Sequence, residues 1–313
     1  MLKFVLSKAV SGLLLLVIVT SATFLLMALS GGDAARTILG DLATPDQVAA
    51  KSAELGLDRP VFARYGEWAI GAIHGDLGTS WLSGTSVATG LGQRFPVSLS
   101  LVVVSLVVTA VLAVVVGLTA AVRGGAIDRF VQVLSVVGFA LPNFWTALLL
   151  VTLLAITVHW FPATGYTAFA DDPGRWAWGL VLPVTALVVG TTASMAQQVR
   201  GAAVDVLRRD YIRTLRASGI SGRSLLFRHV LRNAAPAALT VLSLQFIGLL
   251  GGTVFIERIF ALPGIGSLMV SSVLGGDLPV VVGIVTVMVV VVVVVNFLID
   301  LSVGWLSPKA RLL

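Results

Sequence analysis

Long apolar stretches constrain this chain more than any other feature of its sequence. The last of them, residues 279–299, is nearly pure valine from Val289 to Val295. A helix needs roughly 20 residues to cross about 30 Å of hydrocarbon, and only helices or closed barrels satisfy their backbone groups there. Six stretches are long enough, at residues 9–29, 97–122, 130–158, 179–199, 236–256 and 279–299. The sequence therefore predicts an all-α integral membrane protein with six transmembrane helices.

The first stretch follows Lys3 and Lys8, as the apolar core of a signal peptide would. It is longer than such a core, and no A-x-A cleavage pattern follows it. We therefore expect residues 1–29 to form an N-terminal tail and a retained first transmembrane helix.

The composition excludes several classes of protein. Only 12% of the residues are charged, whereas a soluble domain averages roughly 25%. The chain has no cysteine, which excludes disulfides, thiolate metal sites and a cysteine nucleophile, and its three histidines are far apart in the sequence. No set of paired acids or histidines falls within the apolar stretches, as a membrane-embedded enzyme would need. We expect no bound cofactor or metal, no catalytic residue and no nucleic-acid partner.

The basic residues are distributed unevenly between the connections. Fourteen of the 21 lysines and arginines lie in the two tails and in the second and fourth connections, and eight of these fall between Arg200 and Arg232. The other connections hold seven basic residues and eleven acidic ones. Because basic loops stay on the cytoplasmic side, this pattern places both termini and the Arg-rich connection in the cytoplasm. Residues 30–96 then face outward.

The outer loop, residues 30–96, contains the capping patterns of short helices. Thr44 and Gln47 form a capping box around Pro45, and Gly56 can end that helix in a left-handed conformation. A second helix is expected near Pro60, followed by a turn-rich segment at residues 75–80. The loop could form a compact lid on the membrane surface, a docking surface for an extracellular partner, or a gate.

The fourth connection, residues 200–233, is too elaborate to serve only as a link. Leu207, Tyr211 and Leu215 predict one apolar stripe along a helix. Asp205 with Arg209, and Asp210 with Arg213, are spaced to pair on it. The glycines at 219 and 222 predict a break, after which Ser221 can cap a second helix. This helix–turn–helix indicates either a docking element for another protein or a basic anchor on anionic lipid.

Several segments resemble one protein family in the same order along the chain. Residues 210–219 and 228–233 are similar to the coupling (EAA) loop of binding-protein-dependent ABC importer permeases. In particular, the chain resembles the B-type permease subunit of dipeptide and oligopeptide importers over essentially its whole length. The other matching segments are residues 55–60, 64–65, 75–80, 138–145, 162–166, 263–266 and 277–279, with the single residues Glu257 and Phe260.

The resemblance implies a role for the fourth connection in coupling ATP hydrolysis to transport. In the family, a short helix of this loop sits in a cleft of a cytoplasmic ATPase subunit. Two positions depart from the family pattern: Ser218 stands where a lysine is common, and Gln197 where an arginine is common. The residues that the resemblance assigns to coupling are Asp210, Tyr211, Arg213, Thr214, Arg216, Ala217, Gly219, Arg228, His229 and Asn233.

The chain cannot build an ATP site itself. A phosphate-binding loop needs a lysine directly after a glycine, and no lysine here follows one. ATP and Mg²⁺ would therefore belong to partner subunits. The resemblance implies a second, homologous permease in a heterodimer, two ATPase subunits or one fused ATPase, and an extracellular substrate-binding lipoprotein that delivers a di- or oligopeptide. It also implies a bacterial cytoplasmic membrane and a transmembrane domain at residues 97–306, with a cytoplasmic tail at 307–313.

Polar and turn-forming residues near the apolar stretches are candidates for the translocation path or its gate. Pro142 predicts a kink in the third helix. Asn143 and Gln245 can either bond neighbouring helices or line a cavity. Residues 257–279 can form an external gate or an interfacial loop anchored by Phe260. The full set is Pro142, Asn143, Gln245, Glu257, Phe260, Pro263, Gly264, Gly266 and Asp277.

Two alternatives to a peptide importer remain. Relatives of the same architecture carry nickel, glutathione or other small solutes, and the separate binding protein largely sets that choice. An ion-coupled secondary transporter would need inverted repeats or buried charges in the membrane. The six stretches show neither plainly, and such a transporter would have no use for the element at residues 200–233.

Overall fold

The computed structural model describes residues 2–29 and 34–306. Within these ranges the chain is helical, with one isolated bridge between Thr79 and Ser86 and no strand. The expected tail at 307–313, and residues 30–33 of the first loop, lie outside the described residues. The chain divides into two compact units. Unit 1 contains residues up to Ser98 and Pro263–Val294, and unit 2 contains Leu99–Leu262 and the residues from Val295 onward.

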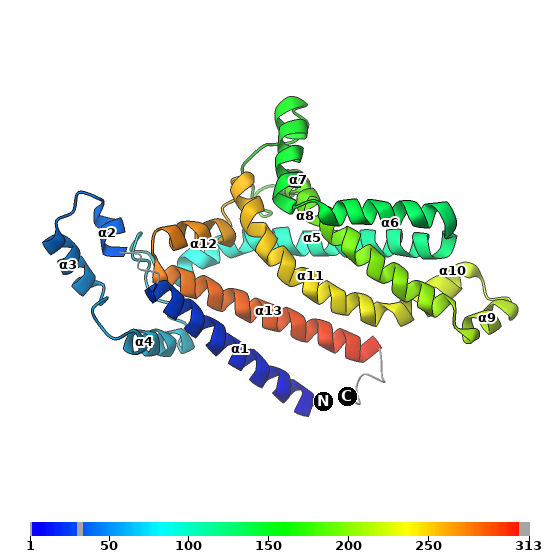
Figure 1. The fold of residues 1–313 in the computed structure, drawn as a ribbon, viewed down its shortest axis with the longest axis horizontal. Helices are drawn as coiled ribbons and strands as arrows, with labels where there is room; N and C mark the ends of the chain where they lie inside the picture. Colours follow the sequence, from blue (N-terminus) through cyan, green and yellow to red (C-terminus); the bar gives the residue numbers. More distant parts are fainter. Residues whose placement is uncertain (1, 30–33, 307–313) are drawn as a thin grey trace. The chain divides into compact units, whose positions relative to one another are not determined.

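Five helices of the described chain are long and apolar enough to cross a membrane. Three of the predicted stretches lie inside single helices that extend further at both ends, and a fourth, residues 9–29, ends together with its helix at Leu29 (Figure 1). The fifth, residues 236–256, lies in a helix that continues without a break from Gly222. The helices are α1 (Leu2–Leu29), α5 (Val87–Arg123), α8 (Pro173–Leu207), α11 (Arg232–Ile259) and α13 (Leu278–Leu306).

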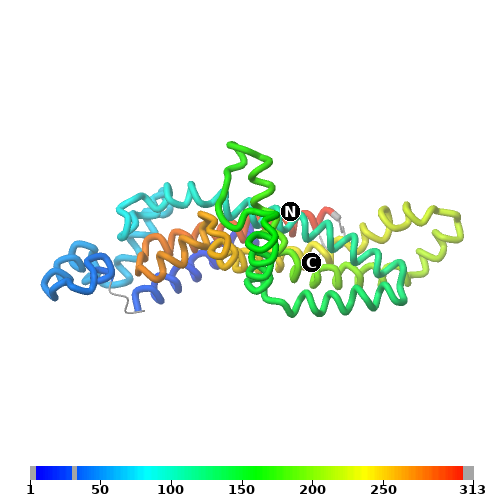
Figure 2. The backbone as a smooth tube through the Cα atoms, turned by 90° about the horizontal axis from the view of Figure 1, so that it is seen from above, coloured from blue at the N-terminus to red at the C-terminus, as the bar shows by residue number. Residues whose placement is uncertain are grey.

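The predicted third helix, residues 130–158, is broken. Helix α6 (Gly125–Ala140) is followed by α7 (Asn143–Leu150) and a π-helical turn, η1 (Val151–Thr157), and the two halves meet at 94° (Figure 2). Pro142 has no N–H to donate and forces Leu141 into an extended conformation, with ψ 118°. The predicted kink is therefore a complete break. Counting the bent pair as one crossing gives up to six spans.

Unit 1 contains the first loop, folded as three short helices. They are α2 (Ala34–Leu39), α3 (Pro45–Glu54) and α4 (Val61–Ile73). The predicted capping box is confirmed, since Thr44 Oγ1 accepts from Gln47 N and Gln47 Oε1 accepts from Thr44 N. Gly56 follows with φ +67°, also as predicted. The loop is thus a folded element with its own caps.

The core of unit 1 joins this loop to α1, α12 (Ile265–Leu274) and α13. Phe24 of α1 and Val282 of α13 are buried together, with Tyr65 and Trp68 of α4 packed against them. Tyr65 also exchanges a 3.0 Å hydrogen bond with Thr20 of α1. The face of α4 that carries Tyr65 and Trp68 therefore packs inward.

Unit 2 is organised around α8. Helix α8 contains many buried residues and packs against α6, α7 and α11, and Figure 1 shows α6 running beside α8. Close approach is possible because small residues face one another. A side chain at Gly117 of α5 would meet the Ala196 carbonyl of α8 at 2.7 Å, and one at Gly138 of α6 would meet Ala193 at 3.2 Å.

The loop predicted at residues 200–233 is smaller than the sequence indicates. Helix α8 continues to Leu207, and the helix that starts with α10 (Gly222–Ser224) runs through the π-helical turn η2 (Leu225–Leu231) into α11. Only residues 208–221 lie outside these long helices, and they contain α9 (Asp210–Ala217). The predicted second helix of the helix–turn–helix is therefore the beginning of the fifth spanning helix.

Candidate functional site

Helix α9 packs against the rest of unit 2 through one apolar edge. Ile212 is fully buried in a cluster that also contains Val206 of α8 and Val230 of η2, and Leu215 packs against the same cluster. The predicted stripe through Leu207, Tyr211 and Leu215 is wrong, because the helix ends at Leu207 and restarts at Asp210. The predicted pair of Asp205 and Arg209 is lost for the same reason.

The remaining sides of α9 face outward. The side chains of Asp210 and Arg213 are 97% and 78% exposed and form the predicted ion pair at 3.8 Å. Tyr211 is 38% exposed, and the other outward residues are Thr214, Arg216 and Ala217. Six of the residues predicted for coupling therefore lie on a short amphipathic helix that presents a polar and partly aromatic surface.

The turn after α9 depends on two local features that the sequence predicts. Gly219 has φ +77°, in the left-handed region that a residue with a side chain rarely adopts. Ser221 Oγ accepts a hydrogen bond from Ser224 N at 3.4 Å and so caps the following helix. The turn thus fixes where α9 ends and where the long helix through α11 begins.

Three further residues predicted for coupling lie on this long helix rather than on α9. Arg228 and His229 belong to η2, and Asn233 lies in the first turn of α11. The Asn233 amide donates to the His229 carbonyl at 2.7 Å, within the same helix. Arg228 and Asn233 are exposed. The predicted coupling residues therefore form two groups, one on α9 and one on the helix that follows.

An open pocket of about 430 Å³ lies beside the turn. Arg216 of α9 and Arg223 of α10 line it, together with apolar residues that include Leu207 and Ile220. Two exposed guanidinium groups, one on each side of Gly219, thus give this end of unit 2 a positively charged concave surface.

Five of the predicted pathway residues lie in unit 2. Asn143, directly after Pro142, lies between α8 and α11: a side-chain carbon at Gly190 would be 3.5 Å from its Oδ1, and one at Gly252 would be 3.1 Å from its Nδ2. Gln245 of α11 donates to Ser194 of α8 at 3.1 Å, which is the helix–helix bond that the sequence allows.

Glu257 and Phe260 are both buried at the end of α11. The Glu257 carbonyl accepts from Leu262 N at 2.8 Å, and the Phe260 carbonyl accepts from Gly165 N at 3.1 Å. These two residues therefore close the end of α11 against the turn that follows it and against the connection after η1.

The other four pathway residues lie in unit 1. The segment predicted as a gate or interfacial loop contains a helix, α12, with Pro263 and Gly264 directly before it and Gly266 in its first turn. Asp277 follows α12 and is 2% exposed. Its carboxylate accepts from Ser80 Oγ at 2.5 Å and from Trp81 N at 3.1 Å. Asp277 thus holds the first loop to the turn between α12 and α13.

Arg59 and Glu67 form an exposed ion pair in the first loop. Arg59 Nη1 donates to Glu67 Oε2 at 2.9 Å, and a second hydrogen bond joins Nη2 to Oε1. This hydrogen bonding to Arg59 holds the pKa of Glu67 below its usual value. The pair joins the turn before α4 to the middle of that helix.

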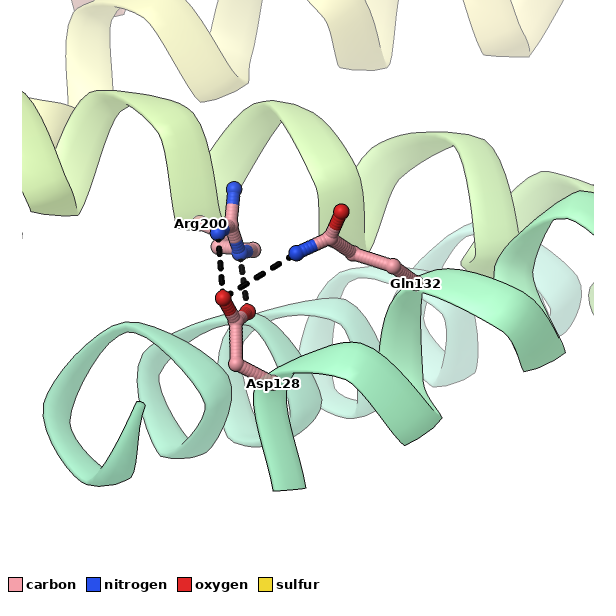
Figure 3. Close-up of polar contacts among 3 residues, drawn as sticks. All are labelled: Asp128, Gln132 and Arg200. Atoms are coloured by element: carbon pink, nitrogen blue, oxygen red, sulfur yellow. Dashed lines mark hydrogen bonds and ion pairs between the residues drawn. The ribbon is translucent and has the colours of Figure 1, made fainter. Parts of the chain in front are cut away.

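The sequence gives no indication of the ion pair between Asp128 of α6 and Arg200 of α8 (Figure 3). The two residues are 72 positions apart, so no helical spacing relates them. Ile212 was missed as well, although its i, i+3 spacing to Leu215 is compatible with one buried edge. Both features depend on how α6, α8 and α9 pack.

Known proteins match the chain over nearly its whole length. Residues 113–312 match the family described as binding-protein-dependent transport system inner membrane component, and residues 1–102 match the N-terminal region of such membrane components. A putative peptide transport system permease protein of Brucella abortus is 38% identical over 99% of each chain. A probable peptide ABC transporter permease protein of Sinorhizobium fredii is 34% identical over 98% of this chain and 99% of its own.

Two further similarities bear on substrate and fold. A glutathione transport system permease protein of Salmonella paratyphi A is 33% identical over 99% of each chain. A solved chain of the MetNI methionine ABC transporter, in an inward-facing conformation, matches 69% of this chain and 96% of its own, with a TM-score of 0.55 and 18% identity. This last likeness shows a common fold. The chain therefore belongs to the family of inner membrane components of binding-protein-dependent transport systems, as an ABC importer permease.

Proposed function

We propose that the chain forms half of the translocation path of an ATP-driven importer of di- or oligopeptides, coupled to its ATPases through α9. The observation that carries the proposal is the state of α9: one apolar edge is buried through Ile212, while its polar surface is exposed. A short helix held in this way at the end of α8 can receive a partner's surface and pass its movement to the bundle. The partners would be two ATPase subunits or one fused ATPase, which would bind ATP and Mg²⁺.

The rest of the assembly follows from the same proposal. One chain with five long helices and one bent pair encloses little room, so a second, homologous permease would complete the path. We place both termini and α9 in the cytoplasm of a bacterial cell, because fourteen of the 21 basic residues fall on that side. The folded first loop would then face the extracellular binding protein. The bent pair would count as one of six crossings.

Peptide is the proposed cargo because relatives at 38% and 34% identity carry that name. Glutathione is the second candidate, since a relative at 33% identity is named for its transport. The test is ATP-driven uptake by the complete importer in proteoliposomes, with labelled dipeptide, pentapeptide, glutathione and Ni²⁺ offered in parallel. Uptake of either labelled peptide supports the proposal. Uptake of glutathione or Ni²⁺ without uptake of either peptide would identify that solute as the cargo and reject the peptide proposal.

Coupling is tested separately at Gly219. A valine there must adopt φ +77°, which costs about 1–3 kcal/mol and distorts the turn after α9. Gly219→Val should leave the chain inserted and the ATPase active, but should lower uptake per ATP hydrolysed. Gly222→Val is the matched control, since Gly222 starts α10 with open space around it and without positive φ. Normal uptake by Gly219→Val, with ATPase bound, would reject the role of α9.

A further inference from the structure

The carboxylate of Asp128 is surrounded by three N–H donors from two helices. Arg200 uses its Nε and Nη2 to bond one carboxylate oxygen each, so the pair is bidentate (Figure 3). Gln132, one turn further along α6, donates to Asp128 Oδ2 at 3.0 Å. The side chains of Arg200 and Asp128 are only 25% and 16% exposed. This geometry is more constrained than that of an ordinary surface ion pair, whose partners are free to move apart.

The contact lies at one end of a long helix–helix interface. Near the other end, Gly138 of α6 approaches Ala193 and Gly190 of α8 so closely that an added side chain would meet Ala193 at 3.2 Å. Helices α6 and α8 are therefore held together at two points, by small residues near the break and by the ion pair at the start of α6. Two helices that are held together at both ends of their interface move as one body more readily than two helices that are held at one end.

The position of Arg200 connects this pair to α9. Arg200 is seven residues from the end of α8, or about 10 Å along a helix. The apolar cluster that anchors Ile212 contains α8 residues before and after Arg200, including Val199 and Ala203. It contains no residue of α6. The ion pair thus ties α6 to the stretch of α8 that shares this cluster with α9.

We propose that Asp128, Arg200 and Gln132 form a clamp that makes α6 follow α8 when an ATPase moves α9. The proposal rests on the coupling role proposed above for α9. In the clamped state, displacement of α8 carries α6 with it and so moves the 94° break, where Asn143 lies between Gly190 and Gly252. Without the clamp, only the contact near the break joins the two helices, and α6 follows the displacement of α8 less closely. These are positioning residues, since they act through the helices and not on the cargo.

The test uses the complete importer in proteoliposomes and measures cargo imported per ATP hydrolysed. Asp128→Asn keeps the shape and removes the charge, and we expect it to lower this ratio about tenfold. Arg200→Lys keeps the positive charge but cannot form the bidentate contact, so it should lower the ratio less than Asp128→Asn does. The exchanged pair, Asp128→Arg with Arg200→Asp, should recover to within about threefold of the unmodified importer. Arg129→Gln is the matched control, because Arg129 is exposed beside Asp128 on α6.

Several results would overturn the clamp. It fails if Asp128→Asn keeps the normal ratio, or if the exchanged pair is as defective as the single variants. It also fails if Arg129→Gln is equally defective, since any change to this turn would then have the same effect. Gly219→Val, measured alongside, separates the two proposals. If only Gly219→Val lowers the ratio, coupling through α9 stands without the clamp; if neither lowers it, the coupling role itself is wrong.

A second measurement applies even if the single variants assemble poorly. The chain has no cysteine, so Asp128→Cys with Arg200→Cys introduces its only two thiols. A short bismaleimide linker between them would replace the ion pair by a covalent tie. The clamp predicts that the linked importer regains uptake per ATP relative to the same variant before linking. Efficient linking without any recovery would contradict it.

Discussion

Removal of the Asp277 carboxylate should release the first loop from the turn between α12 and α13. The carboxylate is 2% exposed and accepts from Ser80 Oγ at 2.5 Å and from Trp81 N at 3.1 Å. These donors are almost 200 positions earlier in the chain. In the Asp277→Ala variant both donors lose their acceptor in a site that admits little water. The segment at residues 78–86 then has fewer contacts that oppose its opening.

The size of the effect follows from the two bonds. A hydrogen bond to a charged acceptor contributes about 1.5–3 kcal/mol, so the loss of two gives about 3–6 kcal/mol. Since about 1.4 kcal/mol corresponds to a factor of ten, the open fraction of this segment should rise at least about a hundredfold. Asp277→Asn should cost less, because its amide oxygen can still accept one of the two bonds.

Amide hydrogen exchange in the purified importer measures this opening directly. Peptides that cover residues 78–86 should exchange at least about a hundredfold faster in Asp277→Ala than in the unmodified protein. Asp76→Ala is the control: its exposed carboxylate accepts one hydrogen bond within the described residues, from Gly78 N at 2.8 Å, and its removal should have an effect below about tenfold. Unchanged exchange at residues 78–86 in Asp277→Ala would refute the argument.

Three further variants test other parts of the account. Ile212→Ala removes the fully buried side chain that anchors α9 and should destabilise the packing of α9 by about 2–5 kcal/mol. The variant should insert normally but recover less ATPase with the chain. Undiminished recovery of the ATPase would contradict the anchoring role of Ile212. Gly117→Ala places a carbon 2.7 Å from a backbone carbonyl of α8, so we expect a clear fall in the melting temperature of the detergent-solubilised protein, and no fall would contradict close packing there. The Arg59–Glu67 pair lowers the pKa of Glu67, so the small stabilisation of the folded loop by this pair is present above pH 4.5, the ordinary pKa of a glutamate, and is lost as the pH falls through the lower pKa of the folded state. Glu67→Gln should therefore weaken the dependence of hydrogen exchange in α4 on pH at the acid side. An unchanged pH profile in this variant would count against the pair.

Local features were predictable because their causes lie within a few residues. The Thr44 capping box, the left-handed Gly56, the turn at Gly219 and the interruption at Pro142, predicted as a kink, each follow from one side chain or its absence. Their partners are at most four positions away. The sequence alone therefore places these turns and caps correctly.

Features that depend on packing were not predictable in the same way. No glycine or proline marks the end of α8 at Leu207, and Arg209 is extended, with ψ 144°, where α9 leaves the helix axis. The apolar spacing of Leu207, Tyr211 and Leu215 therefore predicts one continuous helix across a point where the helix stops. The partner of Arg200 is 72 positions away and that of Asp277 almost 200, so both contacts require the fold to be known.

The proposed transport mechanism depends on the binding of an ATPase by α9. The most direct measurement is purification of the tagged chain from native membranes in mild detergent, with and without scrambling of residues 210–219, followed by identification of every protein recovered. We predict a second permease and ATPases with a phosphate-binding loop beside the unmodified chain, and loss of the ATPases from the scrambled one. Recovery of the unmodified chain alone, or as a homo-oligomer without an ATPase, would contradict it.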